Sequence, residues 1–164
     1  GLRQVVATFG AEVLAEDGTL DRKRLGKRVF ADPNERARLE GLLHPLIRAL
    51  QKRRMAEFAA RGEPLACYEA PLLVEVGLAA EMRPLVVVSA DEATQIARAK
   101  TRDGMDEKAA RARLAAQLPL AEKRALADYV IENTGSLEHL RSETDRVLDA
   151  ICGKLGVAPE RYAR

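Results

Sequence analysis

Three short apolar runs, at residues 64–69, 85–88 and 129–131, interrupt a sequence that otherwise has the pattern of helices. Runs of this length without polar alternation are typical of strands buried on both faces, as in a parallel sheet. Stretches with helical spacing of apolar residues lie between the second run and the third. Strands that alternate with helices in this way indicate an α/β fold whose strands run parallel. This alternation limits the possible architectures more than any other feature of the chain.

The remaining sequence favours helices, because it holds 28 alanines and 20 arginines, and both residue types are strong helix formers. The pattern predicts helices over residues 21–30, 32–60, 93–102, 106–118, 121–126 and 136–155. For the helix over 32–60, Asp32 is the expected cap, Pro33 the first helical residue and Glu35 the carboxylate of a capping box. Pro45 should kink or interrupt it. The side chains expected to face inward include Phe30, Leu46, Ile47 and Leu50.

Length and composition exclude several classes of protein. A chain of 164 residues with 47% hydrophobic residues suits one domain, which needs no disulfide or metal to hold its core. No apolar stretch is long enough to span a membrane, and no export signal is visible, so we expect a cytoplasmic protein. Cys67 and Cys152 are predicted to be reduced, buried thiols. Neither they nor the two histidines have zinc-binding spacing, so no metal ligands are predicted.

The charge is unevenly distributed along the chain. Residues 1–62 carry a net charge of +5, whereas residues 63–164 carry −3. A basic first part is suited to a ligand that bears phosphate, although solvated helix faces would give the same count. The basic part has no interleaved aromatic residues for base stacking, which counts against binding of single-stranded nucleic acid.

Polar side chains follow the apolar runs, where ligands of open α/β sheets bind. Glu75 closes the turn after the first run, and Asn133 and Gly135 follow the third. Arg102 lies at the end of the helix over 93–102, and Arg113 lies on the helical excursion that follows it. Arginines on such a flap can neutralise the charge of a transferring phosphoryl group. Neither a phosphate-binding loop of the form G-x-x-x-x-G-K-[ST] nor a G-x-G-x-x-G motif is present in the sequence.

The order of these motifs resembles the dephospho-CoA kinase family over almost the whole chain. Residues 71–75 (Pro-Leu-Leu-Val-Glu) are similar to the family's Pro-Leu-Leu-Phe-Glu signature, with Val74 where phenylalanine is usual. His44 and Pro45 resemble its His-Pro motif. The run of Gln95, Arg98, Arg102, Asp103 and Gly104 resembles the entry to the lid, and Arg113, Gln117, Lys123, Asn133 and Gly135 resemble the lid and adenine-side motifs.

The resemblance implies a parallel-sheet P-loop kinase of the nucleotide-kinase type, with residues 1–164 forming a single, partial kinase domain. It implies a helical coenzyme-binding region over 20–62, an α/β core over 63–102 and 127–155, and a lid over 103–126. The implied reaction transfers the γ-phosphoryl group of ATP, with Mg²⁺, to the ribose 3′-hydroxyl of dephospho-CoA. By this resemblance Arg113 and Arg102 are catalytic, and Arg113, Asn133 and Gly135 bind ATP. His44, Pro45, Leu73 and Glu75 are implied to face dephospho-CoA.

The sequence departs from the family in one respect. Members begin with a strand, a P-loop and a second strand with an Asp-x-Asp motif, and this sequence starts after that part. We therefore expect the chain to be the later part of a full kinase, with the first strand and the P-loop absent from it. Two alternatives stay open: a catalytically inactive truncated binding module, and another nucleoside or nucleotide kinase. The sequence does not predict an oligomeric state.

Overall fold

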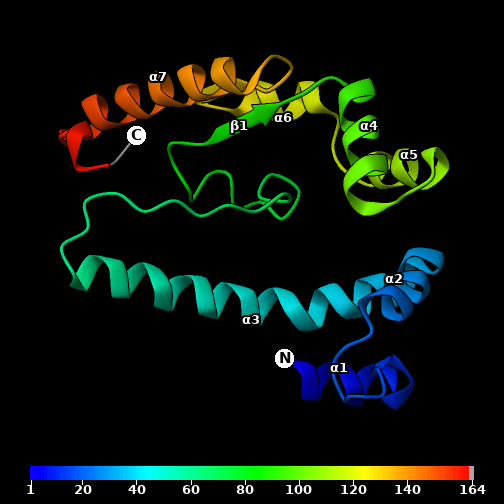
Figure 1. Cartoon of the computed structure of the whole chain (residues 1–164). Helices are drawn as coiled ribbons and strands as arrows, with labels where there is room; N and C mark the ends of the chain where they lie inside the picture. The colour runs from blue at the N-terminus through cyan, green and yellow to red at the C-terminus, as the bar shows by residue number, and fades with distance from the viewer. Residues whose placement is uncertain (163–164) are drawn as a thin grey trace. The chain divides into compact units, whose positions relative to one another are not determined.

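The computed structural model describes residues 1–162 and forms two compact units, divided between Tyr68 and Glu69 (Figure 1). The first unit is helical and contains α1 (Leu2–Phe9), a 3₁₀ turn (Ala11–Val13), α2 (Arg22–Ala31) and α3 (Pro33–Ala60). The second unit contains β1 (Val86–Ser89), α4 (Glu92–Asp103), α5 (Glu107–Ala115), α6 (Leu120–Leu126), β2 (Tyr129–Glu132), α7 (Leu137–Leu155) and a 3₁₀ turn (Pro159–Arg161).

The core of the first unit lies where α1, α2 and the start of α3 meet. Its buried members are Val5, Phe9, Val13, Leu25 and Val29, and the partly buried side chains of Val6, Leu20, Leu39, Leu42 and Leu43 pack around them. Phe9 is the largest of the fully buried side chains, at 2% exposure. Two arginines of the later helices lie over its ring, with Arg28 at 5.3 Å and Arg38 at 5.6 Å from the ring centroid. These guanidinium groups also donate hydrogen bonds to the carbonyls of Phe9 and Thr8, at the end of α1.

Local capping explains where the helices of this unit begin. Asp21 accepts a hydrogen bond from the backbone N–H of Arg24, and Asp32 accepts one from that of Asn34. Glu35 was predicted to complete a capping box at the start of α3, but its carboxylate makes other contacts. Glu35 forms ion pairs with Arg28 (2.6 Å) and Arg38 (2.7 Å), so its carboxylate ties α2 to α3. Two nearby guanidinium groups are stronger donors to a carboxylate than one backbone N–H.

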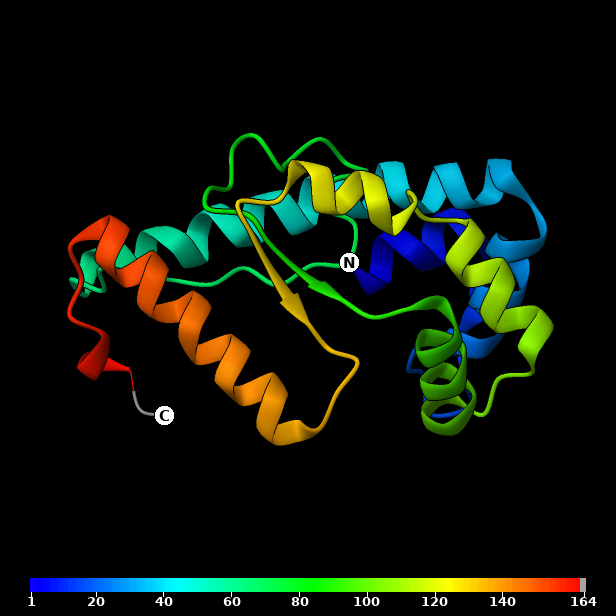
Figure 2. The same ribbon diagram turned by 90° about the horizontal axis from the view of Figure 1, so that it is seen from above.

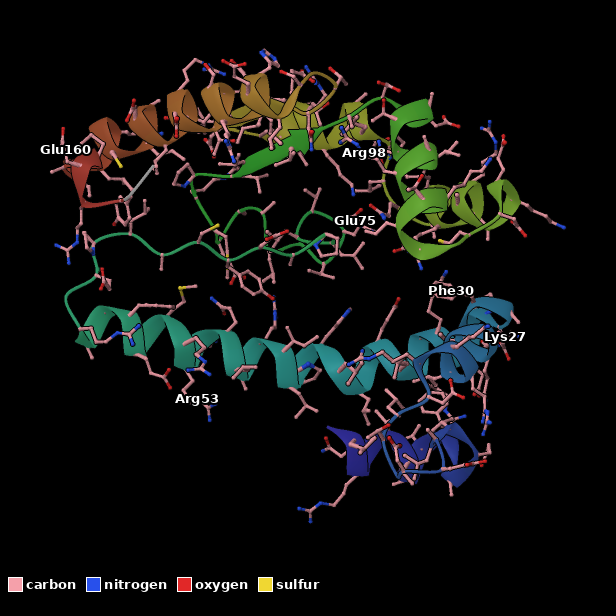
Figure 3. All side chains as sticks on the ribbon, viewed as in Figure 1. Lys27, Phe30, Arg53, Glu75, Arg98 and Glu160 are labelled. Carbon is pink, nitrogen blue, oxygen red and sulfur yellow. The ribbon has the colours of Figure 1, made fainter. Side chains whose placement is uncertain are left out.

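Expectations for α3 were partly wrong. Pro45 lies inside the helix, but the predicted interruption does not occur, since the helix runs unbroken from Pro33 to Ala60. Leu46, Ile47 and Leu50 were expected to face inward but are exposed, because only the first turns of α3 pack against the core of this unit. Phe30 on α2 is likewise exposed, and its side chain points away from α1 (Figure 3).

The sheet of the second unit confirms the predicted parallel arrangement. β1 and β2 pair in parallel with Val86 opposite Tyr129 and Ser89 opposite Glu132, and the two strands run side by side in Figure 2. α6 packs on β1 and α7 packs on β2. The long helical connection between the strands, through α4, α5 and α6, is the crossover that a parallel pair requires.

The run over 64–69 was predicted to be a strand, but the structure assigns it no strand. Within residues 1–162 no strand pairs with this segment, and an extended segment without a ladder partner leaves its backbone groups to other donors and acceptors. Cys67 in this segment is exposed, not buried as expected, whereas Cys152 on α7 is fully buried. β1 is buried on alternate residues, with Val88 57% exposed, and so is not covered on both faces as predicted.

A small apolar cluster supports the site described below. Ala79, Leu85 and Val87 are its buried members, and Leu73 and Val74 of the turn before β1 pack against it, as do Leu120 and Ala127 at the ends of α6. The cluster thus fixes the turn over 71–77 and α6 against the same strand. Among residues 1–162, no helix combines the length and the apolar character needed to cross a lipid bilayer.

Candidate functional site

The carboxyl ends of β1 and β2 are joined by a polar network. The buried Ser89 hydroxyl accepts a hydrogen bond of 2.7 Å from the Arg124 guanidinium, which also pairs with Glu132 at the end of β2. Arg124 belongs to α6, so the network connects this helix to both strand ends. None of the sequence motifs pointed to Ser89, Arg124 or Glu132. Two signals in the sequence could have identified this network. Ser89 ends the apolar run of β1, and Glu132 ends β2 at the paired position.

Asn133 and Gly135 form the turn that leads from β2 into α7. The Asn133 N–H donates to the Ser89 carbonyl at 2.7 Å, which extends the sheet by one bond. A Cβ atom at Gly135 would lie 3.0 Å from the His139 ring, so the first turn of α7 leaves little room for a side chain there. The adjacent Ser136 caps α7 by accepting from the His139 N–H. Gly135 itself is exposed and lies just beyond the carboxyl end of β2.

The structure brings the two predicted catalytic arginines together on one carboxylate. Arg102 is the second-last residue of α4 and donates two hydrogen bonds to Asp103, at 2.7 Å to Oδ1 and 2.9 Å to Oδ2. Arg113 of α5 donates to the same Oδ2 at 2.8 Å. Gly104 in the left-handed conformation (φ 62°) ends α4 and lets the chain turn back into α5. Both guanidinium groups remain accessible, with Arg102 75% and Arg113 44% exposed, so a phosphate group can reach them.

This cluster predicts how Asp103 titrates. The hydrogen bonds from Arg102, with smaller contributions from Arg113, lower the pKa of Asp103 from 3.8 to about 2. A pKa lowered by folding means that the stabilisation is present above pH 3.8 and is lost as the pH falls toward 2. Arg102→Ala should raise this pKa more than Arg113→Ala, because Arg102 is the larger cause. An NMR titration of the Asp103 carboxyl carbon measures the pKa in each variant. An equal rise in the two variants would contradict the larger role of Arg102.

The turn over 71–75 is attached to α6 by an ion pair. Glu75 Oε1 lies 2.6 Å from Lys123 Nζ and also accepts a hydrogen bond of 3.2 Å from the Leu118 N–H. Burial alone would raise the pKa of Glu75, but the hydrogen bonds from Lys123 and from backbone N–H groups outweigh burial and leave the pKa lowered. Leu73 of the same turn packs into the apolar cluster. In the structure the Glu75 carboxylate is therefore committed to Lys123 and Leu118.

Next to this ion pair, a cleft of about 570 Å³ opens among α4, α5 and α6. Gln95, Arg111, Gln117 and Lys123 supply most of its polar lining. Gln95 is oriented by a hydrogen bond to the Ala90 carbonyl (2.6 Å), and Arg111 is held by Glu92 and Glu107. The cleft lies within the second unit, between α4 and the helices α5 and α6, over which the lid was predicted.

The remaining predicted residues, His44 and Pro45, lie on α3 in the first unit. Pro45 is exposed and His44 is half-buried. The structure therefore divides the predicted site residues between two units, with six in the second unit and these two in the first.

Within residues 1–162 no three carboxylate, histidine or cysteine side chains come together as ligands. The charges available to a phosphate group in the second unit are those of its arginines and lysines.

The chain is similar in sequence to known proteins. The family model described as dephospho-CoA kinase matches residues 1–139. A dephospho-CoA kinase of Anaeromyxobacter dehalogenans is 51% identical over 98% of this chain and 79% of that protein. One from Syntrophotalea carbinolica is 47% identical over 87% of this chain and 67% of that protein.

Solved structures agree with the sequence relatives. A crystal structure of a Thermus thermophilus protein matches 93% of this chain and 75% of its own chain, with a TM-score of 0.71 and 32% identity. A dephospho-CoA kinase from Campylobacter jejuni matches 92% of this chain and 75% of its own, with a TM-score of 0.61 and 29% identity. The parallel sheet and these neighbours define an enzyme of the P-loop kinase fold. The chain belongs to the dephospho-CoA kinase family, which confirms the resemblance seen in the sequence.

Proposed function

We propose that the protein uses ATP to phosphorylate the ribose 3′-hydroxyl of dephospho-CoA. The observation that carries this proposal is the pair of exposed arginines, Arg102 and Arg113, held on Asp103 in a chain of this family. In the transfer, the ribose 3′-hydroxyl loses its proton to solvent and its oxygen forms a bond to the γ-phosphorus. The bond between the γ-phosphorus and the β–γ bridging oxygen breaks, and ADP leaves with that oxygen. Fixed cations stabilise most of the negative charge on the transferring phosphoryl group, and the planar fork of a guanidinium group matches the geometry of its oxygens.

Within this proposal, each predicted residue has a place. Arg113, supported by Arg102, neutralises the ATP phosphates, and the turn of Asn133 and Gly135 lies beside adenine. Residues 103–126 act as the lid, and 63–102 with 127–155 form the core that carries these groups. The helical region over 20–62 receives dephospho-CoA through His44 and Pro45, and the turn of Leu73 and Glu75 faces the same substrate.

The basic first part of the chain supports a substrate that bears several phosphate groups. Residues 1–62 have a net charge of +5, and much of it lies on α2 and α3. Mg²⁺ accompanies ATP in kinases of this class and neutralises part of its charge. The proposal assigns the protein to the cytoplasm, with small-molecule substrates and no nucleic acid.

A comparison of acceptors tests the proposal. The complete gene product is incubated with ATP, magnesium and either dephospho-CoA, adenosine or AMP, and ADP release is followed together with the mass of the product. We expect ADP release with dephospho-CoA, and a product heavier by one phosphoryl group. Preference for adenosine or AMP would indicate another nucleoside or nucleotide kinase. Thermal stabilisation by CoA without ADP release from any mixture would indicate an inactive binding module.

A further inference from the structure

The ion pair between Glu75 and Lys123 joins segments 48 residues apart in the sequence and is shielded from solvent. The Glu75 side chain is 16% exposed and that of Lys123 is 13% exposed, so both charges are largely shielded from solvent. Figure 3 shows Glu75 on the irregular segment that leads to β1. The other partner lies on α6, inside the region over 103–126.

Each partner of this pair makes additional contacts with the link between α5 and α6. Glu75 accepts from the Leu118 N–H, in the link itself. The Lys123 ammonium also donates to Gln117 Oε1 at 2.9 Å and to the Pro71 carbonyl at 3.5 Å. Two charged side chains thus close a ring between the turn over 71–75 and residues 117–123.

Because these contacts are costly to break, they restrain the link between α5 and α6 at Leu118. Removing one partner of a shielded pair leaves the other charge uncompensated, which costs far more than breaking an exposed pair. Glu75 Oε2 is buried without a hydrogen bond among the described residues, so the carboxylate depends on its contacts through Oε1. Pro119 follows Leu118 directly, and its fixed φ angle further limits the link.

We propose that Glu75 is a positioning residue, which with Lys123 fixes the α5–α6 link and so sets the place of Arg113 on α5. Arg113 lies five residues before Leu118, at the end of α5 that leads into the link. The turn that is proposed to face dephospho-CoA is thereby connected mechanically to the arginine that is proposed to meet ATP. This inference rests on the proposed function for its catalytic consequence, but not for the structural connection itself.

Hydrogen exchange of the complete gene product tests the structural connection without any measurement of activity. Glu75→Gln keeps the shape of the side chain and removes its charge. We expect amide exchange over residues 116–126 to become at least about tenfold faster, because the ring that protects the link is opened. Glu143→Gln is the matched control: Glu143 pairs with Arg146 within α7, and its loss should leave exchange over 116–126 unchanged. Unchanged exchange in Glu75→Gln would overturn the proposal.

A double variant separates a specific pair from general destabilisation. Lys123→Gln should raise exchange as Glu75→Gln does, whereas Glu75→Gln with Lys123→Gln should fall back toward the unmodified chain, because two neutral amides can hydrogen-bond without a stranded charge. Additive effects of the two changes would contradict the pairing. If Glu75→Gln does not fold, the double variant and Lys123→Gln alone still decide the matter by the same comparison.

Kinetics of the complete gene product test the consequence for Arg113. Glu75→Gln should lower kcat by roughly 10- to 100-fold, since a displaced catalytic group costs about this much, and the double variant should recover part of it. The KM for dephospho-CoA should change less than kcat. An unchanged kcat with faster exchange would show that the link does not position Arg113. If even the unmodified enzyme is inactive with dephospho-CoA, the proposed function fails, and the exchange comparison still decides the connection.

Discussion

Arg113→Ala is expected to lower kcat of the complete gene product by about 10²- to 10³-fold while leaving its unfolding transition nearly unchanged. The guanidinium is accessible and is held on Asp103 beside Arg102, so its removal takes a positive charge from the place where the phosphoryl group is proposed to pass. Folding should be little affected, because an exposed ion pair contributes at most about 1 kcal/mol. Single-turnover assays with ATP and dephospho-CoA, alongside thermal melting, provide both measurements.

Arg146→Ala is the control for this experiment. Arg146 is an exposed arginine that pairs with a carboxylate, Glu143, on α7, but it was not selected for the site. We expect its kcat to match that of the unmodified enzyme. If Arg113→Ala also left kcat unchanged, Arg113 would be removed from the site, and the pair on Asp103 would be a surface ion-pair cluster.

Phe9→Ala should reduce the free energy of unfolding by about 3–5 kcal/mol, the usual cost of removing a buried aromatic ring. Phe9 is 2% exposed and lies at the centre of the first unit's core. The substitution also takes away the ring over which Arg28 and Arg38 lie. These two arginines would keep their hydrogen bonds to the end of α1 but lose the aromatic face beneath them. Urea denaturation followed by circular dichroism measures the change.

The chain provides a matched control for this substitution. Phe30→Ala removes the same ring from an exposed position on α2, and we expect a change within about 0.5 kcal/mol. Equal destabilisation by the two variants would mean that Phe30 is covered in solution and that the core of the first unit is not as described.

Features that depend on neighbouring residues could be predicted from the sequence, whereas features that depend on distant contacts could not. Helix starts were predicted at Asp32 and Ser136, because a capping side chain needs only its own next residues. The parallel pair of β1 and β2 followed from two apolar runs separated by helices. The run over 64–69 is also mostly apolar, but a strand needs a partner as well, and the described residues do not supply one.

Within the candidate site, residue types were easier to predict than contacts. The sequence selected Arg102, Arg113 and Glu75 through a resemblance, but it could not show that both arginines share Asp103. Nor could it show that the Glu75 carboxylate holds the α5–α6 link. Ser89 and Arg124 were not predicted as site residues, because their contact spans 35 residues of sequence and neither belongs to one of the family motifs.

The sequence by itself determined the class of fold, the family and nearly all the helices, since propensity, capping and motif order are properties of neighbouring residues. Only the tertiary structure decided which side chains are covered and which charges meet. It buried Phe9 and left Phe30 exposed, although both lie in the last turn of a helix, because burial depends on which face a neighbouring helix covers. It placed Lys123 on Glu75 rather than on one of the other carboxylates, because the apolar cluster around Leu85 packs the turn and α6 against one strand.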